Sequence, residues 1–223
     1  MTESDFVSLE VAAALLGISI RHVRRLANSG RLTQVARGVL ERDSVDRYLM
    51  SQRQGRTRSW AEHTAWGAIA LLSGEEADWL GPTQASRIRR TLRELVDPSD
   101  LVSRVRDRAH VQTFAAHRAA MPRLRAIVVR PNMNALGIVD SGEARIDGYI
   151  AASDLDNAIR TLGLRIESSG DITLRVTNFD FNQVRKLVST SAVVAALDAA
   201  TVLDPRIRGV GQRALAEMLE AYR

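Results

Sequence analysis

Four residues near the start of the chain have side chains and a spacing suited to binding nucleic acid. Arg21, His22, Arg24 and Arg25 fall within five positions, and no acidic residue separates them. A guanidinium group can form two parallel hydrogen bonds with a guanine edge, and it also pairs with phosphate. We therefore expect this cluster to contact DNA bases.

Further cations extend the cluster toward the DNA backbone. Residues 1–60 hold ten arginines against six acids, and the whole chain carries a formal net charge of +5. Such an excess attracts phosphate. A surface salt bridge with Asp46 or Glu41 is the alternative for Arg25. The complete set of expected DNA contacts is Ser19, Arg21, His22, Arg24, Arg25, Arg31, Arg37, Arg42, Arg53, Arg56 and Arg58.

Residue types that carry catalysis are sparse or poorly spaced. The chain has no cysteine, and its four histidines lack the spacing of a zinc site. His110 and His117 would suit one helix face, but a surface or capping role explains each more simply. Asp147, Asp154 and Asp156 fit a strand end and helix N-caps better than a metal cluster. We expect no enzymatic activity, no bound metal and no cofactor.

Short elements around the arginines would present them to a partner. Apolar residues recur at helical spacing in two segments and alternate as in strands in a third. Polar residues that can accept hydrogen bonds from the first amides precede the helices. The expected elements are a helix over residues 9–16 between Ser8 and Gly17, a helix over 20–28 after Ser19, a ribbon over 32–42 turning at Gly38, and a third helix capped by Asp43.

The same residues carry a family pattern. The chain contains Leu9-x-x-Ala12-Ala13-x-Leu15-Leu16-Gly17-Ile18-Ser19, followed by Arg21-x-Val23-x-Arg25-Leu26-x-x-x-Gly30-x-Leu32. This pattern resembles the winged helix-turn-helix of excisionase and MerR-type DNA-binding domains. The resemblance implies that residues 20–28 form the recognition helix. The chain departs from the family at the wing, where relatives often carry an Arg-aromatic-Arg run and residues 37–42 contain no aromatic side chain.

The remainder of the chain predicts an α+β fold. Residues 191–203 are apolar on nearly every side, which indicates a buried helix or, alternatively, a dimer surface. The expected domains are a winged helix-turn-helix over residues 1–52, a basic linker over 53–59, and an α+β regulatory domain over 60–223 that is helical over 60–108 and mixed over 109–223. Expected helices cover 60–72, 82–96, 98–108 after Asp97, a segment from Ser153 or Asp154 to 162, 191–203 and 204–222; expected strands cover 109–115 and 145–151, with a hairpin over 164–176 turning at 168–171.

Segments of this second domain carry a further resemblance. They are Thr64 to Gly74, Ser86 to Arg90, Val193 to Asp198 and Asp204 to Gly211. Together with the N-terminal pattern they resemble the AbiEi type of antitoxin. The resemblance implies an autorepressor encoded beside a nucleotidyltransferase-like toxin, often acting without a stable complex with that toxin.

We therefore expect a sequence-specific transcriptional repressor that binds its own operator in double-stranded DNA. Because a DNA-binding domain of this size contacts few base pairs, we expect a homodimer or a cooperative assembly on DNA. The alternatives are a protein-binding module that neutralises a partner directly, a phage-type excisionase or other transcription regulator, and a ligand sensor lined by Trp60, Trp66 and Trp79. The first six residues form no apolar leader and no stretch reaches the ~20 apolar residues of a membrane helix, so we expect a cytoplasmic protein without membrane partners.

Overall fold

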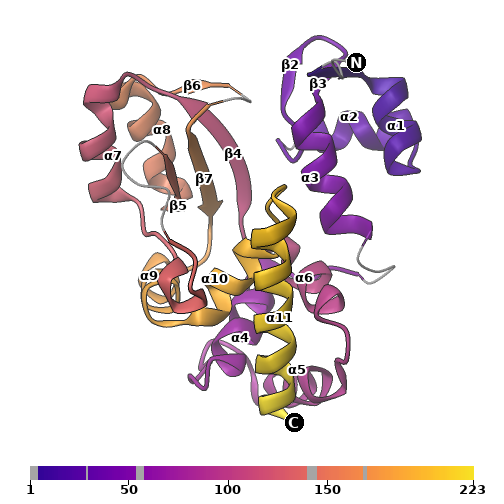
Figure 1. Cartoon of the computed structure of the whole chain (residues 1–223), viewed down its shortest axis with the longest axis vertical. Helices are drawn as coiled ribbons and strands as arrows, with labels where there is room; N and C mark the ends of the chain where they lie inside the picture. Colours follow the sequence, from indigo (N-terminus) through magenta and orange to yellow (C-terminus); the bar gives the residue numbers. More distant parts are fainter. Residues whose placement is uncertain (1–4, 29, 54–57, 140–144, 168–169) are drawn as a thin grey trace.

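The computed structural model describes residues 5–28, 30–53, 58–139, 145–167 and 170–223, and these residues form helices and two sheets (Figure 1). The predicted α+β character is therefore confirmed. The buried apolar side chains gather into three clusters, one in the first 45 residues, one among the helices around Trp66 and one on the larger sheet. Among the described residues, none of the helices combines the length and the apolar character needed to cross a lipid bilayer.

The N-terminal unit packs three helices against a small antiparallel sheet. Its first helix begins where the Ser8 hydroxyl accepts a hydrogen bond from the Val11 amide, and it ends at Gly17, whose φ of 65° few other residues adopt readily. The sheet order is β1-β3-β2. The elements are β1 (Phe6–Ser8), α1 (Leu9–Leu16), α2 (Ile20–Asn28), β2 (Gln34–Ala36), β3 (Val39–Glu41) and α3 (Arg42–Arg53).

Two details of this unit differ from the prediction. The strand β1 was not predicted, because its partner β3 lies more than thirty residues later in the chain. The helix α3 begins at Arg42, so Asp43 lies inside its first turn and is not its cap. The hydroxyl of Ser44 donates a hydrogen bond to the carbonyl oxygen of Glu41 and accepts one from the Thr33 amide. That arrangement joins the start of α3 to the ribbon.

The largest apolar cluster lies in a layer of helices below the sheets in Figure 1. Trp66, in the centre of α4, is fully buried and donates from its indole to the carbonyl oxygen of Arg108 at 2.9 Å. The predicted cap Asp97 accepts a hydrogen bond at the start of its helix, and Asp204, expected as the first residue of the last helix, is the cap of that helix. The elements are α4 (Glu62–Leu72), α5 (Pro82–Glu94), α6 (Pro98–Val105), the 3₁₀ turn η1 (Arg106–Arg108), α9 (Phe181–Thr190), α10 (Ala192–Ala199) and α11 (Pro205–Tyr222).

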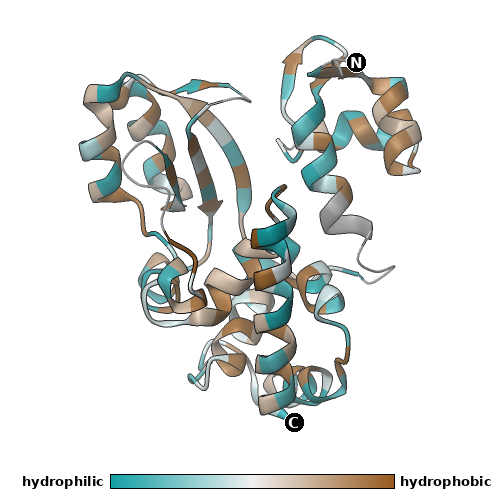
Figure 2. Cartoon of the chain, viewed as in Figure 1, coloured by the Kyte–Doolittle hydropathy of each residue, from teal (hydrophilic) through white to brown (hydrophobic). Residues whose placement is uncertain are grey.

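The larger sheet has the strand order β5-β7-β4-β6, and β5 pairs with β7 in parallel. Hydrophobic and more polar residues alternate along β7 in Figure 2, because Ile172, Leu174 and Val176 pack in the apolar cluster with α7 and α8 while the residues between them lie on the other face of the sheet. The elements are β4 (His110–Ala115), η2 (Arg118–Ala120), α7 (Met121–Ile127), η3 (Met133–Leu136), β5 (Ile146–Ala151), α8 (Ala152–Leu162), β6 (Arg165–Ile166) and β7 (Ile172–Thr177).

Two predictions for this half of the chain are wrong, and two helices were missed. The expected hairpin over residues 164–176 does not form, because β4 lies between β6 and β7 and pairs with both; residues 168 and 169 of its turn lie outside the described part. Neither Ser153 nor Asp154 caps α8, which begins at Ala152. The helices α7 and α9 were not predicted. The buried helix expected over residues 191–203 is present as the shorter α10, and because its side chains lie in the core, they are not free to form the alternative dimer surface.

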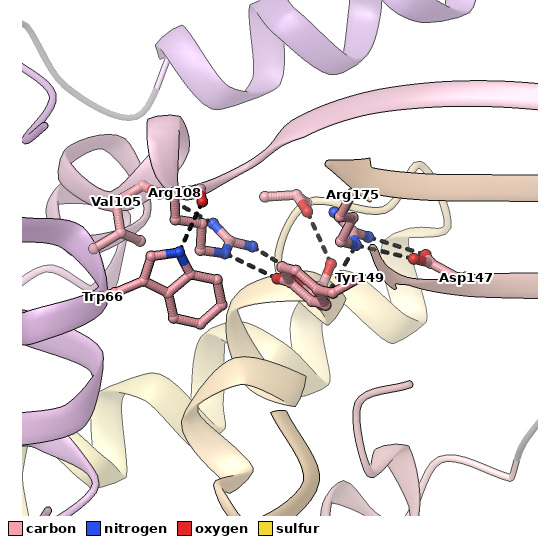
Figure 3. Close-up of polar contacts among 8 residues, drawn as sticks. Trp66, Val105, Arg108, Asp147, Tyr149 and Arg175 are labelled. Carbon is pink, nitrogen blue, oxygen red and sulfur yellow. Dashed lines mark hydrogen bonds and ion pairs between the residues drawn. The ribbon is translucent and has the colours of Figure 1, made fainter. Parts of the chain in front are cut away.

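A buried ionic cluster joins the helical layer to the sheet (Figure 3). Asp198 of α10 accepts hydrogen bonds from the guanidinium of Arg108 and from the hydroxyl of Tyr149, the latter at 2.9 Å. Arg175 of β7 donates two hydrogen bonds of 2.9 Å to Asp147 of β5, and its Nε lies 3.4 Å from the second oxygen of Asp198. The two positive and two negative side chains balance, which keeps the cluster neutral from the buried Asp198 to the partly exposed Asp147.

Candidate nucleic-acid interface

Helix α2 presents a polar outer face because its two largest buried residues point inward. Val23 is fully buried and Leu26 is 5% exposed, and both pack in the N-terminal apolar cluster. Arg21, Arg24 and Arg25 lie on the opposite side of the helix and are exposed. The predicted base-contacting arginines therefore share one solvent-facing surface.

The two neighbours His22 and Arg25 contact each other on this surface. Arg25 Nη2 lies 3.1 Å from His22 Nε2, which steadies both side chains at one end of the face. The alternative ion pairs of Arg25 with Glu41 or Asp46 are not formed among the described residues. These acids have other partners: Asp46 pairs with Arg42 at 3.0 Å, and Glu41 pairs with Arg47 at 3.5 Å.

An open groove of about 650 Å³ separates α2 from the β2–β3 turn. Arg24 and Arg37 face it from opposite sides, and neither forms an ion pair with a described residue in this structure. Glu10 lies at the edge of the groove. The hydroxyl of Ser8, with Arg24 contributing, lowers the pKa of Glu10, so its carboxylate is ionised at neutral pH. The full lining is Leu9, Glu10, Arg24, Asn28, Gln34, Arg37 and Gly38.

The remaining predicted contacts fall into distinct groups. Ser19 acts as a cap for α2, because its hydroxyl accepts from the His22 amide at 3.3 Å. Arg31 is bound by Asp107 at 2.6 Å, and Arg42 is bound by Asp46, so both are engaged within the protein. Arg58 is exposed. Arg56 lies outside the described residues, as does the side chain of Arg53.

Two further groove residues, Asn28 and Gln34, were not predicted from the sequence. Asn28 lies four positions after Arg24 and therefore on the same face of α2, a spacing that could have identified it. Gln34 precedes the turn and donates from its amide to the carbonyl oxygen of Ala36 at 3.1 Å. Both amides offer donors and acceptors of the kind that read base edges or bind phosphate.

The residues considered for other chemistry have structural roles. Within the part of the chain that the structure describes, no three histidine, aspartate or glutamate side chains gather as a metal site would require. His117 accepts from the Ala119 amide as the expected cap. Trp66 and Trp79 both pack against Phe179, and Trp60 lies under Arg104, so these indoles belong to packing in the helical layer.

Comparisons with known proteins add no family to this geometry. Neither a protein-family model, nor a curated protein, nor a solved structure matches the chain.

Proposed function

We propose that residues 6–53 form a winged helix-turn-helix that binds double-stranded DNA, with α2 as the recognition helix and the β2–β3 turn as the wing. The observation that carries the proposal is the exposed row of Arg21, Arg24, Arg25 and Asn28 on α2, beside a groove that ends at Arg37. In this proposal the guanidinium and amide groups of α2 enter the major groove. The ribbon would then lie along the adjacent sugar-phosphate backbone.

The roles of the residues follow from their positions. Arg21, Arg24 and Arg25 are proposed to contact base edges, with His22 supporting Arg25. Arg37 is proposed to bind a phosphate that lies over the groove, while Glu10 would repel a phosphate placed close to the start of α1. A good bidentate contact between arginine and guanine contributes about 1–3 kcal/mol of discrimination against a wrong base.

We further propose that the protein is a cytoplasmic autorepressor of the antitoxin type, without catalytic activity of its own. The support is the similarity of Thr64 to Gly74 and of Asp204 to Gly211 to AbiEi-type segments. The genetic partner would be a nucleotidyltransferase-like toxin. One recognition helix covers few base pairs. We therefore propose that the operator contains two half-sites, which are bound by a homodimer or by two molecules that bind cooperatively.

The decisive experiment measures binding of the full chain to its own upstream DNA and to a scrambled fragment of equal length. We expect specific binding, and a loss of about tenfold or more for Arg24→Ala and for Arg21→Ala. Arg89→Ala is the matched control, because Arg89 is an exposed arginine on α5 at the far end of the molecule (Figure 1). Equal affinity for both fragments, or an equal loss with the control, would refute sequence-specific reading by α2.

A second variant separates backbone contact from base reading. Arg37→Ala should weaken binding to specific and scrambled DNA by the same factor, and should reduce the slope of log affinity against log salt by about one. A loss confined to the specific fragment would instead assign Arg37 to base recognition.

A further inference from the structure

The turn that follows α2 is bound to η1 through one carboxylate. Arg31 is fixed to the helix end because its amide donates to the carbonyl oxygen of Leu26 at 2.8 Å. Its Nη2 lies 2.6 Å from Oδ1 of Asp107, a residue of η1. The other oxygen of Asp107 accepts a 2.6 Å hydrogen bond from the hydroxyl of Ser59. One carboxylate therefore ties α2, the segment before α4 and η1 together.

Close packing beside this ion pair also joins the turn after α2 to the start of β4. Gly30 has a φ of 69°, and a Cβ at this position would lie 2.6 Å from Nε2 of His110 at the start of β4. This nitrogen is buried and has no hydrogen-bond partner among the described residues. The imidazole edge thus fills the space that the missing side chain of Gly30 leaves, and α3 lies beside α6 nearby (Figure 1).

The contact uses a cation that would otherwise be available to DNA. Arg31 lies between the recognition helix and the ribbon, and burial, which would lower its pKa, is outweighed by Asp107 and Tyr48, so Arg31 stays charged. A carboxylate and a phosphate offer a guanidinium similar pairs of oxygen acceptors. We propose that the Asp107 carboxylate takes the place of a DNA phosphate on Arg31, so that the docked arrangement withholds Arg31 from DNA. This inference rests on the proposed function.

The surroundings of Asp107 allow the exchange. If Arg31 moves to a phosphate, Asp107 keeps the hydroxyl of Ser59 and lies 3.9 Å from Nε of Arg106. Neither charge is then left without a partner, which would otherwise be costly. Both side chains are also partly exposed, with 34% of Arg31 and 22% of Asp107 accessible, so water can enter as they separate. Docking and DNA binding therefore compete for one guanidinium.

The test compares the full-length chain with Asp107→Asn in binding to scrambled DNA across a salt series. We expect Asp107→Asn to bind about threefold to tenfold more tightly, with a salt slope steeper by about one, because one more phosphate is contacted. Arg31→Ala added to this variant should remove the gain. Glu76→Gln is the control, since it removes the same charge from an exposed residue that has no ion pair among the described residues.

Small-angle X-ray scattering without DNA provides a second readout. Asp107→Asn should enlarge the radius of gyration if the carboxylate holds the N-terminal unit in place. The inference is overturned if the native chain binds DNA while Asp107→Asn leaves both affinity and radius unchanged, or if Glu76→Gln gives the same gain. Absence of DNA binding by the native chain and every variant would instead overturn the proposed function, and with it the role of Arg31.

Discussion

At the scale of single residues, Asp198 lies in the fully buried interior and is paired there with three neighbouring side chains. It is 0% exposed and accepts hydrogen bonds from Arg108 and Tyr149. One of its oxygens has no hydrogen-bond partner among the described residues and faces Arg175 at 3.4 Å. Burial also raises the pKa of Tyr149, so its hydroxyl keeps its proton and can donate to Asp198. The cluster is thus a set of mutually dependent groups.

Removing one charge from this cluster should be costly. We expect Asp198→Ala to lower the free energy of unfolding by about 3–5 kcal/mol, because Arg108 would remain buried without its counter-charge. Urea denaturation followed by circular dichroism measures the change. The control is Glu75→Gln, which breaks an exposed pair with Lys186 and should cost less than about 1 kcal/mol. Similar losses for the two variants would contradict a special cost of breaking the buried cluster.

At the scale of elements, α11 contains two glycines with opposite surroundings. A Cβ on Gly211 would lie 2.5 Å from the amide nitrogen of Ala200 and 2.6 Å from the carbonyl oxygen of Ala196, both backbone atoms of the adjoining α10 segment. A Cβ on Gly209 would come no closer than 3.4 Å, to the flexible end of Arg213. Gly211 therefore permits the close approach of α10 and α11, whereas Gly209 only reduces the helix propensity of α11.

The two positions give a matched prediction. Gly209→Ala should raise the free energy of unfolding by up to about 1 kcal/mol, since alanine favours a helix. Gly211→Ala should lower it by about 1–3 kcal/mol, because the backbone of α10 must move away. Thermal and urea denaturation of both variants provide the measurement. A stabilising effect of Gly211→Ala would show that the helices are not packed as closely as described.

Elements with local signals could be predicted from the sequence, and those that depend on distant partners could not. The caps Ser8, Asp97 and Asp204 each bond an amide within three residues, so their helices were identified. The strand β1 and the separation of β6 from β7 by β4 depend on pairing between residues far apart in the chain. A hydrophobic pattern contains no direct information on such pairing.

The same distinction applies to the candidate site. The exposed row on α2 follows from helical spacing, and sequence alone placed Arg21, Arg24 and Arg25 on one face. The ion pair between Arg31 and Asp107 joins residues that are far apart in the chain and lie in different elements, so nothing near Arg31 indicated it. Asn28 and Gln34 emerged only when the fold brought α2 and β2 to the same groove.

At the scale of the whole molecule, the contact between the N-terminal unit and the rest of the chain should depend on pH through His110. Burial and the neighbouring Arg31 guanidinium lower the pKa of His110 below its ordinary value of 6.5, which means that the folded protein favours the neutral ring. The unfolded chain takes up a proton more readily at this position. The contribution of His110 to stability is therefore complete above about pH 6.5 and is lost as the pH falls below that value.

The measurement is the free energy of unfolding of the native chain and of His110→Gln between about pH 7.5 and about pH 5. We expect the native chain to lose more stability than His110→Gln over this interval, because glutamine does not titrate. The control is His117→Gln, because His117 is exposed and lies at η2, away from Gly30. This variant should keep the pH dependence of the native chain.

If His110→Gln and the native chain lost stability in parallel, the imidazole would not be the group that couples docking to pH. If only His110→Gln kept its stability at low pH, acidification would weaken the contact that binds Arg31 to Asp107. The Arg31 guanidinium would then be released, and binding to scrambled DNA at fixed salt should strengthen.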